Sequence, residues 1–145
     1  MTHDTVGPIT ILRGPDSEIA IDAFHGNNVV AYRRMLGRAE VHALLRPGPE
    51  GIRGYRAGNP ILFPFPNRVS GGRYAFGGRS VQMDINESAR GHRIHGLVFA
   101  LPFEVLEVGA NESEAWHVAR VRLADHADAA RQYPWPLELT VRTAL

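Results

Sequence analysis

The sequence predicts an all-β protein whose architecture is an antiparallel β-sandwich or barrel. Short runs in which apolar and polar residues alternate recur along the chain, and Gly- and Pro-rich turns separate them. Many short strands joined by such turns are typical of antiparallel sheets that pack on each other. Only residues 124–132 have helical propensity, and a helix of that length cannot organise a fold.

The first predicted strands lie in the N-terminal third of the chain. Four apolar runs predict them: residues 9–13, 18–24, 29–32 and 35–45. The first two runs are separated by Gly-Pro-Asp-Ser at 14–17, which are residues that favour turns. The Pro- and Gly-rich residues 47–51 then predict a surface loop.

Residues 58–69 read GNPILFPFPNRV and follow neither a helical nor a strand pattern. Prolines at 60, 64 and 66 remove backbone donors and fix φ, which excludes a helix or a central strand. We expect this segment to cross one end of the sandwich and to present Asn67 and Arg68 at a defined place. Its apolar side chains are expected to be buried there: Leu62, Phe63 and Phe65.

Further strands are predicted in the second half of the chain. Residues 73–76 lead into Gly77-Gly78, which is a signal for a tight hairpin, and residues 81–85 alternate on the return strand. Residues 117–123 and 137–143 also alternate. The last of these patterns is still running at Leu145, which predicts that the domain continues past this residue.

Composition excludes several classes of function. The 145 residues suffice for one domain with a core, and the formal net charge of +1 gives no field to attract nucleic acid or a membrane. The chain has no cysteine, so disulfides, thiolate catalysis and cysteine-bound metals are excluded. It has no apolar run of about 20 residues and no signal peptide at its N-terminus, which predicts a soluble cytoplasmic protein.

Four segments, in their order and spacing, resemble the aldose 1-epimerase (galactose mutarotase) family. They are residues 58–69, 72–78, 85–98 (with Asn86-Glu87 and His95-Gly96) and 133–139, beginning Tyr-Pro. The resemblance covers about residues 58–141. It implies a galactose mutarotase-like supersandwich, of which residues 1–145 form the N-terminal part of a single domain. It also implies interconversion of the α and β anomers of a free aldose, with a sugar as partner and with no cofactor or metal.

The family motifs assign roles to three residues of this chain. Asn67 and Arg68 match the family's Asn-Arg pair, which binds sugar oxygens, and the Arg guanidinium offers a rigid fork of donors. His95 matches a histidine that contacts the sugar near the reacting centre, so it is the candidate catalytic residue. The family's main acid, a His in a Thr-Asn-His segment, and its base, a late Glu, have no counterpart here. The resemblance therefore implies that these 145 residues alone are inactive.

Other residues have simpler readings. Asn67 could instead cap a turn. His92 and His95 form an H-x-x-H pair, but residues i and i+3 of a strand face opposite ways, so we expect no metal there. His92 is expected to be exposed or to line the rim of the cleft. Glu87 and Glu138 are interpreted as solvated carboxylates. Two aromatic residues, Tyr133 and Trp135, are expected to pack within the sandwich.

Two alternative functions remain open from the sequence. A hexose-phosphate mutarotase would need extra basic residues around the cleft to bind phosphate, and Arg73, Arg90 and Arg93 are the candidates. A non-catalytic carbohydrate-binding module would keep Arg68 and His95 without ever having the acid and the base. The sequence leaves the particular aldose and the oligomeric state undetermined.

Overall fold

The computed structural model describes residues 1–44 and 56–145. The predicted loop at 47–51 lies outside these residues. The ten strands of the described part are β1 (Thr2–Val6), β2 (Ile9–Arg13), β3 (Ser17–Asp22), β4 (Asn28–Leu36), β5 (Ala39–His42), β6 (Arg73–Phe76), β7 (Arg79–Gln82), β8 (Glu104–Ala110), β9 (Ala115–Arg122) and β10 (Glu138–Ala144). The helical elements are α1 (Ala127–Gln132) and three short 3₁₀ turns, at Ser70–Gly72, Ser88–Arg90 and Leu123–Asp125.

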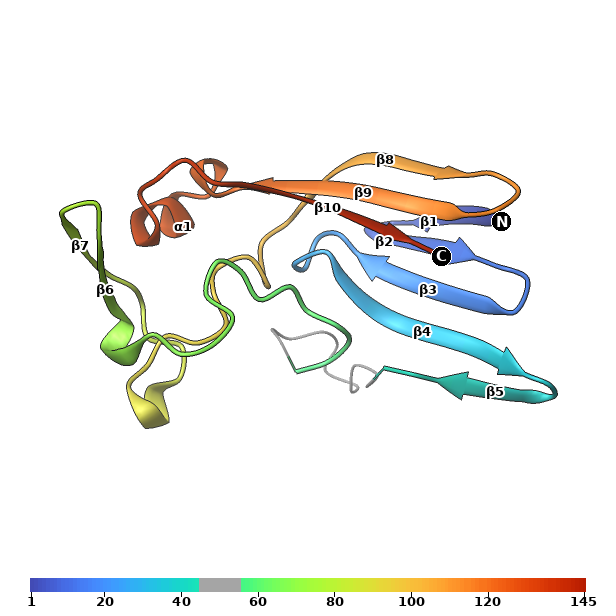
Figure 1. Cartoon of the computed structure of the whole chain (residues 1–145), viewed down its shortest axis with the longest axis horizontal. Coiled ribbons are helices and arrows are strands. Elements are labelled where there is room, and N and C mark those ends of the chain that lie inside the picture. The colour runs from blue at the N-terminus through green and yellow to red at the C-terminus, as the bar shows by residue number, and fades with distance from the viewer. Residues whose placement is uncertain (45–55) are drawn as a thin grey trace.

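The strands form a sandwich and a separate hairpin, and all of their pairings are antiparallel. One sheet has the order β1-β2-β3-β4-β5 and the other has the order β10-β9-β8. In Figure 1 the three-stranded sheet lies over the β1–β2 side of the larger sheet, and the β6–β7 hairpin stands at the opposite end of the molecule. The all-β antiparallel sandwich expected from the sequence is therefore confirmed.

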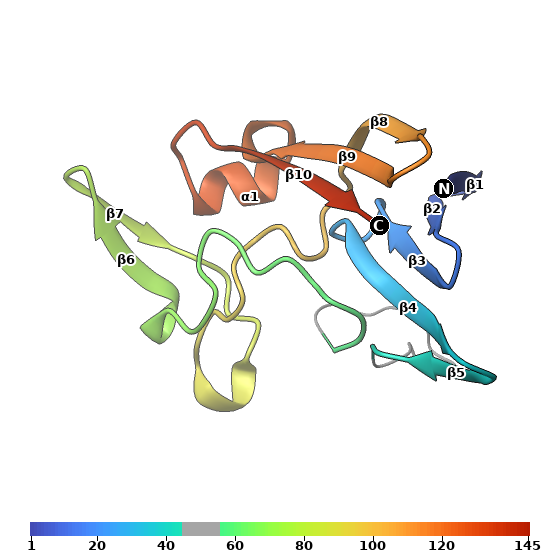
Figure 2. The same ribbon diagram turned by 45° about the vertical axis from the view of Figure 1, so that its right-hand side comes forward.

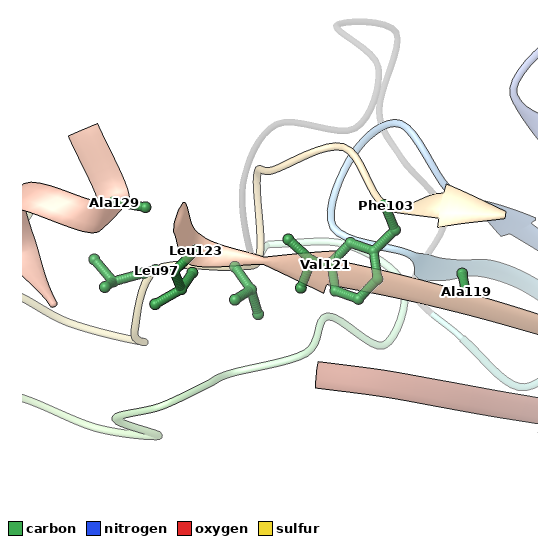
Figure 3. Packing of buried hydrophobic residues seen from close by; sticks show 7 residues of the cluster. Leu97, Phe103, Ala119, Val121, Leu123 and Ala129 are labelled. Carbon is green, nitrogen blue, oxygen red and sulfur yellow. The ribbon is translucent and has the colours of Figure 1, made fainter. Parts of the chain in front are cut away.

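Two hydrophobic clusters hold the sandwich together. Between the sheets, Leu12, Ile19 and Ile21 are buried with Ala115 of β9. The second cluster lies towards α1 and takes alternate residues of β9, as the period-two pattern predicts (Figure 3). Burial of one such aliphatic side chain contributes about 1.5–3 kcal/mol. The second cluster consists of Leu97, Val98, Phe103, Ala119, Val121, Leu123 and Ala129.

The sequence-based strand boundaries hold within two residues for β2, β3, β6, β9 and β10. They are wrong for β4, which runs unbroken through the predicted gap between residues 32 and 35, and for β7, which ends at Gln82 rather than at residue 85. The predicted single strand over 35–45 is interrupted, because β4 ends at Leu36 and a two-residue turn pairs Leu36 with Ala39 of β5. Gly37 has φ +64° in this turn, a conformation that glycine adopts without the steric penalty of a Cβ. Leu45 lies outside the described residues. Strands β1 and β8 were not predicted.

The proline-rich segment 58–69 contains neither a helix nor a strand, as expected, and it has a cis peptide bond before Pro64. Single antiparallel bridges hold its two ends, one from Asn59 to Val29 and one from Val69 to Arg93. Its apolar side chains, which the sequence predicted to be buried, are partly buried. Ile61 and Phe63 pack against the second cluster, so they join this crossing to the sandwich core.

The β6–β7 hairpin is fastened by aromatic rings. Tyr74 lies 5.2 Å from the Phe65 ring and 6.1 Å from Trp135, and Phe76 lies 5.1 Å from Trp135. The Tyr74 hydroxyl also donates to the Gln132 carbonyl at 2.8 Å. Trp135 therefore packs against the hairpin rather than within the sandwich, which corrects the sequence-based expectation for this residue.

Candidate functional site

The candidate site is built where two chain segments run side by side between the sandwich and the hairpin (Figure 2). Val69 and Arg93 form an antiparallel bridge, with N–H···O distances of 2.8 and 3.3 Å. The His95 N–H donates to the Asn67 carbonyl at 3.4 Å. The segment carrying Arg68 and the segment carrying His95 are thus bonded directly to each other. The structure brings all three sequence-predicted site residues together.

Asn86 fixes the residue that precedes His95. Its Nδ2 donates to the Ile94 carbonyl at 3.0 Å, and its Oδ1 accepts from the Ile94 N–H at 2.7 Å. One side chain therefore satisfies both backbone groups of Ile94, as a neighbouring strand would do. Ile94 itself is buried. This clamp holds the approach to His95 in a defined conformation.

Gly96 lets the histidine segment approach the proline-rich segment closely. A Cβ on Gly96 would lie 2.2 Å from the Phe63 carbonyl oxygen, and its φ is +70°. The Leu97 N–H donates to that same oxygen at 2.8 Å. Only glycine fits such an approach at a positive φ. The His-Gly motif therefore has a steric reason in this fold.

His95 has a fixed tautomer. Its φ is +65°, which costs a non-glycine residue about 1 kcal/mol or more, so the surrounding hydrogen bonds must hold it there. Its Nδ1 lies 3.0 Å from the Pro66 carbonyl oxygen. Because a carbonyl only accepts, Nδ1 must carry the proton, and Nε2 is the unprotonated nitrogen of the neutral ring.

The Arg68 side chain is paired with Glu87, a carboxylate that was interpreted from the sequence as solvated. Its Nε and Nη2 donate to the two oxygens of Glu87 at 2.6 and 2.7 Å, and Arg90 adds a third bond at 2.8 Å. These hydrogen bonds, first the one from Arg68, lower the pKa of Glu87 to about 2. Glu87 is therefore anionic throughout the neutral pH range.

The match to a family model decides the identity of the chain. The family model described as aldose 1-epimerase matches residues 20–145. This chain belongs to the aldose 1-epimerase family. The match extends further towards the N-terminus than residues 58–141, where the sequence motifs lie.

Solved structures agree on the fold. A galactose mutarotase-like protein from Clostridium acetobutylicum is 19% identical with a TM-score of 0.80, over 99% of this chain and 44% of that chain. A protein from Synechocystis sp. PCC 6803 is 18% identical with a TM-score of 0.72, over 100% of this chain and 48% of that chain. A galactose 1-epimerase from Lactobacillus acidophilus is 17% identical with a TM-score of 0.69, over 94% and 40%. The chain thus spans less than half the length of these structures, and it shares their galactose mutarotase-like fold.

Asn67 makes a local contact of the turn-capping kind, which the sequence analysis gave as its alternative role. Its Oδ1 accepts from the Arg68 N–H at 2.8 Å, which fixes the backbone on which the Arg68 side chain stands. Asn67 is exposed. Whether it also binds sugar, as the aldose 1-epimerase motif implies, stays a prediction.

His92 is half-buried, and it does not lie on a strand as the argument against an H-x-x-H metal pair had assumed. Its Nδ1 accepts from the Gly71 N–H at 3.2 Å, so its tautomer is opposite to that of His95.

Among the described residues, no group of three or more His, Asp or Glu side chains gathers as metal ligands would. The described residues also include no helix long and apolar enough to cross a membrane.

The three arginines considered for phosphate binding each have a partner in the protein. Arg73 donates to Gln82 at 2.6 Å, Arg90 donates to Glu87, and Arg93 donates to the Gly96 carbonyl at 2.7 and 3.1 Å. Burial lowers the pKa of Arg93. Arg93 thus supports the backbone of the His-Gly motif, which accounts for its place in the sequence without a phosphate.

Proposed function

We propose that this chain is the sugar-binding part of an aldose 1-epimerase, which interconverts the α and β anomers of a free aldose. The supporting observation is that the His95 N–H donates to the Asn67 carbonyl, next to Arg68. This bond couples a cationic fork of donors to a histidine of fixed tautomer. Residues 1–145 are then the N-terminal part of one domain, and its main acid and base lie beyond Leu145.

The reaction needs two proton transfers. A base removes the proton of the C1 hydroxyl while an acid protonates the ring oxygen, and the bond between C1 and that oxygen breaks. Rotation about the C1–C2 bond and closure of the ring then give the other anomer. We propose that Nε2 of His95 assists one of these transfers beside the main acid and base, because Nδ1 is committed to the Pro66 carbonyl. A positioned acid or base contributes about 10²–10⁴-fold to the rate.

Arg68 binds the sugar in this proposal and does not transfer a proton, since a guanidinium keeps its protons at neutral pH. Its planar donors suit two sugar oxygens at once. The pair with Glu87 occupies the Nε–Nη2 edge.

Polarimetry of fresh α-D-glucose and α-D-galactose tests the proposal. We expect the purified 145-residue chain, once circular dichroism shows it folded, not to accelerate mutarotation above buffer. A protein from the longer reading frame, with its own Thr-Asn-His segment and late Glu, is expected to accelerate it. Acceleration by the 145 residues alone would mean that they carry both acid and base, with His95 and His92 as the first suspects.

The same assay separates the alternatives. A carbohydrate-binding module would bind the sugar and leave the rate of optical rotation unchanged, even in the longest reading frame. A hexose-phosphate mutarotase would act on glucose 6-phosphate and not on glucose. The contacts of Arg73, Arg90 and Arg93 within the protein favour the free aldose.

A further inference from the structure

Glu87 has a set of contacts that an ordinary surface carboxylate lacks. Its Oε2 accepts from Arg68 Nε, and its Oε1 accepts from both Arg68 Nη2 and Arg90 Nη1. The Glu87 side chain is 15% exposed, whereas Arg68 is 38% and Arg90 is 64% exposed. The carboxylate therefore lies beneath the two guanidinium groups.

The backbone of Glu87 belongs to the same rigid unit as His95. Its N–H donates to the His92 carbonyl at 3.0 Å, and its carbonyl accepts from the His92 N–H at 3.3 Å. The neighbouring Asn86 clamps Ile94, the residue just before His95. A carboxylate fixed in this unit holds its partner arginine at a fixed place relative to the histidine.

We propose that Glu87 is the positioning residue for Arg68, and that it aligns the guanidinium for sugar before any ligand binds. An arginine side chain has many rotamers, and ordering them at the moment of binding weakens affinity. The bidentate pair orders them in advance. The identity of that ligand as an aldose rests on the proposed function.

An arginine–carboxylate pair away from the candidate site has a similar contact but is not expected to affect sugar binding. Arg122 Nε donates to Glu138 Oε2 at 2.6 Å, with Arg122 41% exposed, and this pair lies on β9 and β10 away from the candidate site. Exposed pairs of this kind contribute little to stability. Glu138→Gln is therefore the matched control for Glu87→Gln.

The test measures kcat and KM for mutarotation, and the dissociation constant of methyl α-D-galactopyranoside, in the full-length protein. The methyl glycoside cannot mutarotate, so binding is read separately from catalysis. We expect Glu87→Gln to raise KM and the dissociation constant roughly tenfold and to change kcat little, because Arg68 contacts ground state and transition state alike. Glu87→Asp should restore part of the affinity, and Glu138→Gln should match the wild type.

Nuclear magnetic resonance of the Arg68 Nε–H gives a readout independent of sugar. We expect a slowly exchanging signal, identified by its loss in Arg68→Lys, that Glu87→Gln abolishes. A signal unchanged in Glu87→Gln overturns the inference, and so does a lost signal with unchanged affinity.

Absence of activity is informative too. A wild-type protein that binds the glycoside but does not mutarotate aldoses refutes the proposed function, and the inference still stands or falls on the Glu87→Gln affinity. A wild-type protein that neither binds nor reacts overturns both.

Discussion

Nε2 of His117 lies 2.9 Å from Oδ1 of Asn27 in the protein interior, where both residues are almost completely buried. Because the amide oxygen accepts, Nε2 carries the proton, and Nδ1 then accepts from the Thr10 hydroxyl at 3.1 Å. His117 lies on β9 and Thr10 on β2, so this histidine bonds the two sheets of the sandwich to each other. Burial lowers its pKa, which means that the fold holds the neutral ring.

Acid should destabilise the protein through His117. Its folded pKa lies below the unfolded value of about 6.5, so the unfolded chain binds the extra proton first. The contribution of neutral His117 to the free energy of unfolding is therefore complete above a pH of about 6.5. This contribution is lost as the pH falls from there towards the folded pKa. Urea unfolding between pH 8 and pH 5 measures this slope. His117→Gln should flatten it, whereas the exposed His3→Gln should leave it as in the wild type.

Gly96→Ala should destabilise the protein more than Gly91→Ala. Both glycines have a positive φ, +70° and +66°, so both variants lose about 1 kcal/mol from backbone strain. Only at Gly96 does the new Cβ meet backbone, 2.2 Å from the Phe63 oxygen, while nothing lies within 4 Å at Gly91. Urea unfolding of both variants compares the two costs. Equal losses would mean that the two segments can move apart freely.

His95→Asn should lower kcat in the full-length protein and leave the fold intact. Asparagine tolerates a positive φ better than most residues, and its amide can donate to the Pro66 carbonyl in place of Nδ1. It lacks a group that transfers protons near neutral pH, so we expect kcat to fall about 10²-fold or more. Polarimetry measures the rate, and circular dichroism is the control for folding. Full activity would assign His95 a structural role only.

Arg68→Ala should weaken sugar binding by about 10- to 100-fold, because a hydrogen bond to a charged group contributes ~1.5–3 kcal/mol. Arg68→Lys should recover little of this loss, since an ammonium cannot make the bidentate contact with Glu87. Isothermal titration with methyl α-D-galactopyranoside measures the affinity. An unchanged affinity in Arg68→Ala would remove this residue from the sugar site.

A chelator should not change the activity of the full-length protein, because acid–base ring opening needs no metal ion. Polarimetry before and after dialysis against EDTA measures this. Activity that is lost on dialysis and returns when a divalent metal is added would contradict the mechanism proposed for His95.

The element pattern was predictable where burial alternates along one strand. β2 and β9 alternate between more and less buried side chains, and β9 places Ala119 and Val121 in the core while Arg120 and Arg122 stay nearer to solvent. β1 is exposed along its whole length, and β8 is mostly exposed, so neither has an apolar period that a sequence could reveal. The turn at Gly37 was missed because apolar residues continue on both sides of it.

The amino-acid sequence by itself determined the fold class, the irregular proline-rich crossing and the three motif residues Asn67, Arg68 and His95, because alternation, proline and short motifs are local properties. Only the tertiary structure decided how those residues are held. Glu87 is 19 residues from Arg68, and His117 is 107 residues from Thr10, and in both cases the partners have no periodic relation along the chain. Such contacts depend on how segments cross in space, which is why a carboxylate interpreted as solvated proved to lie beneath two arginines.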